Sequence, residues 1–405
     1  MPPATVSEEA TEPPLFTRDF ALVLVTQLTF GFAFSSFLLL PKFVVTVLHG
    51  SPSQVGYVGA LSVLSAILVS PWCGRLLDRG QRRPHVVLGC VLSGIAALAF
   101  LHVTEAGPYL YAVRALQGIS YTLYFVGAGT LVADLAPASR LGQALGWFGA
   151  GGLLMNAIAT LIAERVAQRF GWHAVFYGAA ASGFCGALLA LRLREPERAP
   201  QAAKLLAAPA PHAVSAVTGR AAVLWGAAAG GASFGAMFTF TQPLALALGD
   251  SNISPLFAGY TAAALLVRLG FGNLADRLGR ARIGGGALGV YAVVVASTAG
   301  LARGWLGPLG LGFGLAHGAF YPSLNALALE GTARGERGTV GAWFNAAFNA
   351  GVLLVTFCLG QVAQRYGYRV VFLLVACLSA AGCFVVLSQA RKPLRPAPLP
   401  SRSLP

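Results

Sequence analysis

Apolar stretches of about 20 residues recur along the whole chain, each long enough to cross a bilayer as a helix. Short polar segments separate them. A chain built this way can bury its apolar surface only in lipid, because too little polar sequence remains to cover it in water. We therefore expect membrane helices near Phe20–Leu40, Gln54–Leu76, Pro84–Leu101, Tyr109–Leu131, Leu141–Ala163, Trp172–Leu191, Ala221–Leu248, Pro255–Leu274, Arg282–Leu301, Leu306–Leu329, Thr339–Val362 and Val370–Leu387.

The composition agrees with this interpretation. Hydrophobic residues make up 56% of the 405 residues and charged residues only 10%, whereas a soluble domain carries about 25% charged residues. This balance excludes a soluble enzyme, a disordered chain and a nucleic-acid-binding domain. The six cysteines lie inside apolar stretches, and we interpret them as small hydrophobic residues rather than disulfides or metal ligands.

Basic residues divide unevenly between the two sides of the membrane. With the N-terminus placed in the cytoplasm, 20 of the 28 Lys and Arg residues fall in cytoplasmic segments and six in outer loops, while Arg114 and Arg268 lie inside stretches. Positive residues favour the cytoplasmic side. The sequence therefore predicts a multi-pass plasma-membrane protein, in the inner membrane of a bacterium, with both termini cytoplasmic. The same distribution accounts for the net charge of +14 without a nucleic-acid partner.

The chain divides into six stretches plus six. We expect a disordered cytoplasmic tail (1-18), an N-terminal six-helix bundle (19-194), a cytoplasmic linker (195-219), a C-terminal six-helix bundle (220-390) and a second cytoplasmic tail (391-405). The halves repeat each other, since segments 166–176 and 362–372 are identical at seven of eleven positions, at an offset of 196 residues. A parallel repeat of six helices is typical of secondary transporters.

Two loops carry the same motif, one in each half. Gly272 to Arg282 reads GNLADRLGRAR, and Gly74 to Arg83 reads GRLLDRGQRR. They resemble the GxLaDRxGRR loop of the major facilitator superfamily. Arg114 to Gly118, RALQG, is similar to the RxxQG motif of its drug:proton antiporter branch. The resemblance covers the whole chain and implies an all-α integral membrane fold, with 12 transmembrane helices in two pseudo-symmetric six-helix bundles.

The resemblance also implies a substrate cavity lined by the first, fourth, seventh and tenth helices. Helical spacing places Arg114 on one face of the fourth stretch together with the other candidate residues of that stretch. Exposing the charged Arg114 to lipid on this face would cost free energy. Arg114 is expected to face this cavity; the alternative is that neighbouring carbonyls and amides hold it. The predicted cavity residues, including two from the eleventh helix, are Gln27, Phe30, Phe34, Arg114, Gln117, Tyr121, Tyr124, Phe238, Thr241, Gln242, His317, Tyr321, Asn325, Asn345 and Asn349.

Ionisable residues suggest where protons and gates lie. None of the 14 carboxylates lies in the middle of a stretch. His317 is therefore the candidate for proton coupling, because imidazole exchanges a proton near neutral pH, and a structural hydrogen-bonded role is the alternative. The family pattern implies a cytoplasmic gate of two ion-pair clusters, with one basic residue facing each from the opposite half. These gate residues are Asp78, Arg82, Asp134, Arg140, Asp276, Arg280, Glu330 and Arg337.

The sequence thus predicts a secondary active transporter that moves a small organic solute by alternating access, with efflux in exchange for protons as the preferred function. The alternatives are uptake or facilitated diffusion of an organic anion, with Arg114 as its counter-ion, and a membrane receptor or scaffold that does not transport. No P-loop, catalytic constellation or metal-ligand cluster is recognisable in the sequence, so we expect neither enzyme activity nor a cofactor. The expected partners are a small-molecule substrate, the lipid bilayer and protons. We expect the protein to be a monomer.

Overall fold

The computed structural model describes residues 14–79, 81–195, 220–270, 274–332 and 336–390. The C-terminal tail, most of the N-terminal tail and nearly all of the predicted linker lie outside these ranges, and the domain boundaries stay a prediction. Within the described residues, the chain is all-helical, and each of the twelve predicted stretches corresponds to a helix.

The first half contains six of these helices. They are α1 (Arg18–Ser35), continued by η1 (Ser36–Leu39) and α2 (Leu40–Thr46); α3 (Pro52–Arg79); α4 (Arg83–Ala99), followed by η2 (Phe100–His102); α5 (Pro108–Leu135), followed by η3 (Ala138–Arg140); α6 (Leu141–Phe170); and α7 (Trp172–Ala190).

The second half repeats this order. Its helices are α10 (Ala221–Ala247), α11 (Ser254–Gly270), the short α12 (Leu274–Leu278), α13 (Arg280–Ala299), α14 (Leu306–Leu329), α15 (Arg337–Tyr366) and α16 (Tyr368–Ala390). The eighth stretch was predicted to run to Leu274; α11 is described as far as Gly270, and residues 271–273 of the predicted stretch lie outside the described residues.

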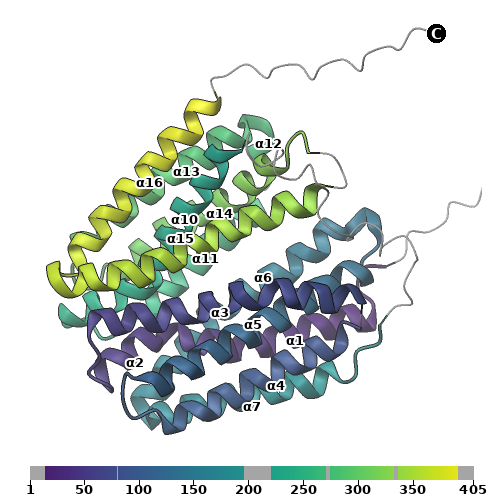
Figure 1. Cartoon of the computed structure of the whole chain (residues 1–405), viewed down its shortest axis with the longest axis horizontal. Helices are drawn as coiled ribbons and strands as arrows, with labels where there is room; N and C mark the ends of the chain where they lie inside the picture. Colours follow the sequence, from purple (N-terminus) through teal and green to yellow (C-terminus); the bar gives the residue numbers. More distant parts are fainter. Residues whose placement is uncertain (1–13, 80, 196–219, 271–273, 333–335, 391–405) are drawn as a thin grey trace, which may run out of the picture.

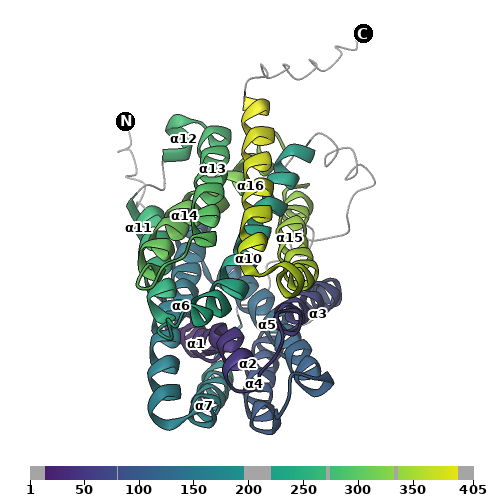
Figure 2. The ribbon, with the colours of Figure 1, turned by 90° about the vertical axis from the view of Figure 1, so that its left-hand side faces the viewer.

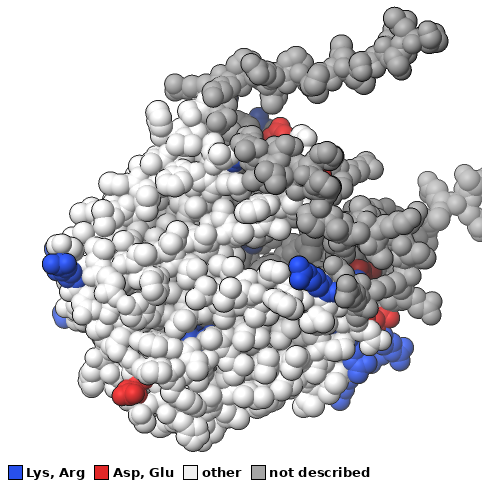
Figure 3. Space-filling model, in the orientation of Figure 1, with Lys and Arg blue, Asp and Glu red and all other residues white. Residues whose placement is uncertain are grey.

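Nine helices among the described residues are long and apolar enough to cross a membrane by their composition alone. Of the remaining long helices, α5 and α14 are less apolar and contain Arg114 and His317, whereas α11, which contains Arg268, is described over 17 residues only. On the face shown in Figure 3, most charged side chains lie near the two ends of the helices, and the surface between them is mostly uncharged. Such a surface is what a lipid-facing band requires.

The two halves lie side by side and contact each other mainly through α3 with α15 and α6 with α11. Figure 2 shows helices of the second half above those of the first. In Figure 1, α3 and α15 lie close together at the left and separate toward the right. We call the end at which α3 begins and α15 ends the outer end, and the opposite end the inner end, after the sides that the sequence predicts.

The internal repeat is visible in the backbone. The joint between α6 and α7 is Gly171, with φ 82°, and the equivalent joint between α15 and α16 is Gly367, with φ 85°. Residues with a side chain rarely adopt this left-handed region, so both joints require glycine. The two joints are 196 residues apart, the offset found in the sequence.

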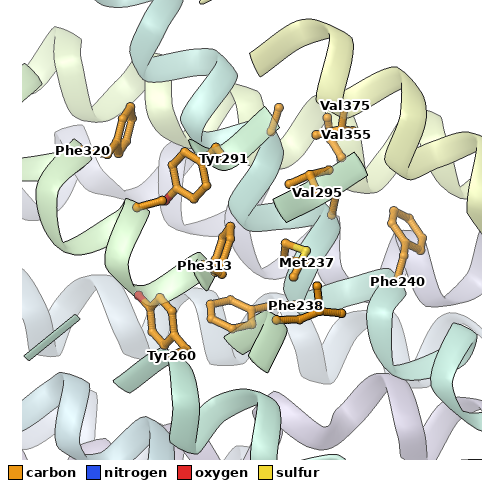
Figure 4. Close-up of a cluster of buried hydrophobic side chains, with 14 of the residues drawn as sticks. Met237, Phe238, Phe240, Tyr260, Tyr291, Val295, Phe313, Phe320, Val355 and Val375 are labelled. Atoms are coloured by element: carbon orange, nitrogen blue, oxygen red, sulfur yellow. The ribbon is translucent and has the colours of Figure 1, made fainter. Parts of the chain in front are cut away.

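Small and aromatic residues build the interior of the second half. Gly310, Gly314 and Gly318 lie one turn apart on α14 and bring it against the backbone of α11. Beside this contact, buried aromatic side chains from α10, α11, α13 and α14 pack together (Figure 4). Among them, Phe238 and Tyr260 have ring centroids 5.0 Å apart.

Candidate functional site

Helices α1 and α5 bring four of the predicted cavity aromatics together. Phe30 stacks on Tyr124 with 3.7 Å between ring centroids, and Phe34 packs on Tyr121 at 4.8 Å. One turn before Phe30, Gln27 is buried against α6, beside Gly151. The predicted faces of the first and fourth helices therefore meet in the structure.

Arg114 is held by three hydrogen bonds between α5 and α3. Its Nε donates to the Val58 carbonyl oxygen (2.9 Å), Nη1 to Gln117 Oε1 (2.5 Å) and Nη2 to Ser62 Oγ (2.8 Å). These partners are carbonyl, amide and hydroxyl groups. They are the kind of neighbours expected if Arg114 is held in place structurally and does not face the cavity. Among the described residues, no carboxylate forms an ion pair with this guanidinium.

The predicted residues of α10 lie deeper than expected. Phe238 packs among the rings of the second half, and Thr241 is fully buried with its hydroxyl donating to Met237 Sδ (3.8 Å). The reason is that α10 is covered by other helices on most of its surface. Gln242 lies between the halves, where its Nε2 donates to the Leu38 carbonyl oxygen of η1 (2.7 Å).

His317 lies inside the aromatic cluster of the second half. Its Nδ1 forms a hydrogen bond with Tyr291 Oη at 2.5 Å. Around it are rings of α10, α11 and α14, several of which Figure 4 labels, including Tyr260, Phe313 and Phe320. The imidazole is thus buried and oriented by one hydroxyl group.

The remaining predicted polar residues lie on α14 and α15. Tyr321 donates its hydroxyl to Asn345 Oδ1, and Asn349 Nδ2 donates to the Asn345 carbonyl oxygen (3.0 Å). Asn345 is exposed although it lies well inside α15. Asn325, one turn beyond Tyr321, is half-buried.

Several buried polar atoms have no hydrogen-bond partner among the described residues. Apart from Arg82, whose charge is paired with Asp134, these atoms are Gln27 Oε1, Tyr124 Oη, Gln242 Oε1, Asn325 Oδ1 and Arg268 Nε. Buried polar groups are nearly always hydrogen-bonded. The first four belong to residues predicted to line the cavity, whereas Arg268 was assigned no role by the sequence.

A buried ionic network closes the outer end, and we call it the outer latch. It consists of Lys42, Glu164, Ser251, Ile253 and Ser254. Lys42 Nζ lies 2.5 Å from Glu164 Oε1 and donates to the Ser251 carbonyl oxygen at 2.5 Å. The side chains of Lys42 and Glu164 are only 10% and 2% exposed.

The Glu164 carboxylate also caps α11 from the opposite half. It accepts hydrogen bonds from the backbone N–H of Ile253 (2.9 Å) and of Ser254 (2.6 Å), and from the Ser254 hydroxyl. A carboxylate at this position satisfies free N–H groups and interacts favourably with the helix dipole. One acidic residue of α6 therefore fixes the position of α11.

Other contacts between the halves at the outer end are close. A side-chain carbon on Gly56 of α3 would lie only 3.1 Å from the Cα of Gly360 on α15, so these two helices touch through their glycines. Beside them, Gln361 donates to the Tyr57 hydroxyl.

Sequence reasoning missed the outer latch. Lys42 and Glu164 were assigned no role from the sequence. The available signal was that one lysine lies two residues after the first stretch and one glutamate directly after the fifth. Their pairing depends on how α2 and α6 pack, which no spacing in the sequence reveals.

At the inner end, one predicted ion pair is present. Arg82 Nε lies 3.0 Å from Asp134 Oδ2, with the Arg82 side chain 7% exposed. In the second half, the main-chain carbonyl of Glu330 accepts from Arg220 (3.1 Å). The side chains of Asp78 and Asp276 lie outside the described residues. Of the other predicted gate residues, Arg140 and Arg280 are half-buried and Arg337 is exposed.

Comparison with known proteins gives matches over residues 22–405. The family profile described as Major Facilitator Superfamily matches residues 22–352 and, separately, 244–405. Multidrug resistance protein 1 of Bacillus subtilis (strain 168) is 31% identical over 163 residues, covering 39% of this chain and 40% of that protein. The multi-drug resistance efflux pump PmrA of Streptococcus pneumoniae serotype 4 is 24% identical over 393 residues, covering 88% and 92%. Among solved structures, the nucleoside transporter NupG has a TM-score of 0.72 at 16% identity, covering 91% of this chain and 99% of that one.

Proposed function

The chain belongs to the major facilitator superfamily, and we propose that it exports a small organic compound across a bacterial inner membrane by alternating access, in exchange for protons. Relatives named as multidrug resistance and efflux proteins support export. The proposal also places both termini in the cytoplasm, as the distribution of basic residues predicts.

The observation that carries the proposal is the difference between the two ends. The halves are joined at the outer end by the latch and by the contact of Gly56 with Gly360, and α3 and α15 diverge toward the inner end (Figure 1). Alternating access requires such a state, in which a path between the bundles opens to one side only. In the export cycle, this inward-open state receives the compound from the cytoplasm.

The first prediction tests export directly in inside-out membrane vesicles. With the vesicle interior made acidic, vesicles containing the protein should accumulate a fluorescent dye against its gradient, and nigericin should abolish the accumulation. Dye quenching is measured for one anionic dye, carboxyfluorescein, and one cationic dye, ethidium. Vesicles without the protein are the control. Uptake by intact cells instead would reverse the proposed direction, and equal signals with and without protein would favour a receptor or scaffold.

The second prediction concerns His317. We expect His317→Gln to remove the dependence on the pH gradient while downhill dye movement continues, because glutamine keeps hydrogen-bonding capacity but cannot carry a proton. The matched control is Tyr291→Phe, which removes only the hydroxyl at Nδ1 and keeps the imidazole. Both variants are assayed in the inside-out vesicles. If His317→Gln still accumulates dye uphill at the normal rate, the histidine is structural and coupling lies elsewhere.

A further inference from the structure

Helix α11 presents a stripe of polar residues at a spacing of seven. Ser254, Thr261 and Arg268 follow one another at this interval. Seven residues complete almost two helical turns, so the three side chains share one face and lie about 10.5 Å apart along the axis. The contacts of the first two show which way that face points.

Ser254 and Thr261 both bond to α6, in the opposite half. The Ser254 hydroxyl contacts the Glu164 carboxylate and the Thr160 carbonyl oxygen (3.4 Å). Thr261 Oγ1 donates to the Leu153 carbonyl oxygen (3.1 Å). The polar stripe of α11 therefore faces α6 along its length.

Arg268 is the third residue of the stripe and has no such partner. It is half-buried, its Nε is inaccessible, and among the described residues none accepts a hydrogen bond from that Nε or forms an ion pair with the guanidinium. The residue opposite on α6 is Gly149, where a side-chain carbon would lie 3.8 Å from Nη1. A guanidinium inside a membrane protein is costly unless an anion or several acceptors surround it.

The neighbouring helices contain no carboxylate to neutralise Arg268. Helices α11 and α14 have no Asp or Glu, and α1 and α6 have only Asp19, at the inner end, and Glu164, in the outer latch.

A second unpartnered group lies one turn away along α6. Gln27 of α1 packs on Gly152, where a side-chain carbon would lie 2.9 Å from its Nε2. Gly152 is three residues from Gly149, which is about 4.5 Å along the axis. Gln27 is 3% exposed, and its Oε1 has no hydrogen-bond donor among the described residues. A cation and a hydrogen-bond acceptor thus lie against the same glycine-rich part of α6.

We propose that Arg268 binds the anionic group of the transported compound and that Gln27 Oε1 accepts a hydrogen bond from the same molecule. The compound is then a small organic anion, carrying a carboxylate, sulfonate or phosphate and at least one N–H or O–H donor. This inference rests on the proposed transport function and names its substrate class. The planar guanidinium suits a carboxylate or phosphate because it can donate two parallel hydrogen bonds.

The third prediction tests this site by equilibrium binding to purified full-length protein, separately from transport. Carboxyfluorescein should bind and ethidium should not, as measured by fluorescence polarisation in detergent. Arg268→Gln should weaken carboxyfluorescein binding about tenfold or more, because a charge-assisted hydrogen bond is lost, and Arg268→Lys should weaken it less. Gly149→Asp should weaken carboxyfluorescein binding to a similar extent, because the new carboxylate would form an ion pair with the unchanged Arg268. Arg365→Gln, on the exposed end of α15, is the control and should bind normally.

Several results would overturn the inference. The first is that the wild-type protein binds no carboxyfluorescein. The second is that Arg268→Gln binds carboxyfluorescein within twofold of wild type, and the third is that ethidium binds as well as carboxyfluorescein does. A lipid phosphate is the other source of an anion. If nanodiscs of phosphatidylglycerol abolish dye binding while phosphatidylcholine nanodiscs preserve it, a lipid takes the site. If carboxyfluorescein binding depends on Arg268 but the vesicles do not transport dye, only the proposed export is refuted. If the vesicles transport dye and Arg268→Gln does not change that transport, only the proposed site is refuted.

Discussion

Replacing Glu164 with alanine should open the outer end and lower transport at least about tenfold. The carboxylate accepts hydrogen bonds from Lys42 of its own half and from Ile253 and Ser254 of the other. Removing one member of a buried ion pair costs about 3–5 kcal/mol, because the remaining charge is left unpaired. The two states of a transporter differ by only a few kcal/mol, so the variant should favour the outward-open state strongly.

Cysteine labelling from outside the cell measures this shift. Leu38 packs against the core of the second half and should become reachable only when the outer end opens. Leu38→Cys is introduced into a background without the native cysteines, because Cys185, Cys358 and Cys377 are exposed. The control is Glu105→Ala, the same change at an exposed residue of an outer loop. Equal labelling of Leu38→Cys with and without Glu164→Ala would show that the latch does not hold the outer end closed.

Replacing Gly314 with leucine should prevent the second half from folding. Even a single side-chain carbon on Gly314 would overlap the carbonyl oxygen of Tyr260 and lie 2.9 Å from Cβ of Ala263. The clash involves the backbone of α11, which cannot move aside as a flexible side chain can. Overpacking of this kind costs about 1–3 kcal/mol or more, and here it would separate α14 from the helix that it contacts most extensively.

The yield of monodisperse protein after detergent extraction measures this effect. We expect almost none for Gly314→Leu. The matched control is Gly286→Leu on α13, because Gly286 is exposed and no atom lies within 4 Å of the position of its missing side chain. A normal yield of Gly314→Leu with an unchanged melting temperature would mean that α11 and α14 do not depend on this close approach.

The sequence predicted the helices well because each is encoded locally. An apolar stretch of membrane-spanning length has few alternatives to a helix in lipid. The two glycine joints, Gly171 and Gly367, could be aligned because duplication kept their surroundings at a fixed offset.

Residues between the halves were much harder to predict. Glu164 and Ser254 are 90 positions apart in the chain, and their contact depends on how two helices pack. Arg268 was counted as a basic residue inside a stretch, and only the seven-residue spacing with Ser254 and Thr261 distinguishes its face. Phe238 and Thr241 were placed on the cavity by helix order alone, which does not account for the cover that other helices give α10.

The weak hydropathy of α5 and α14 has a consequence for biosynthesis. A segment leaves the translocation machinery for lipid on its own only if it is apolar enough, and these two helices are not among the nine that meet that condition. In the finished protein, α14 packs closely on α11. As the ribosome delivers α11 first, α14 should enter the bilayer against this helix and not alone.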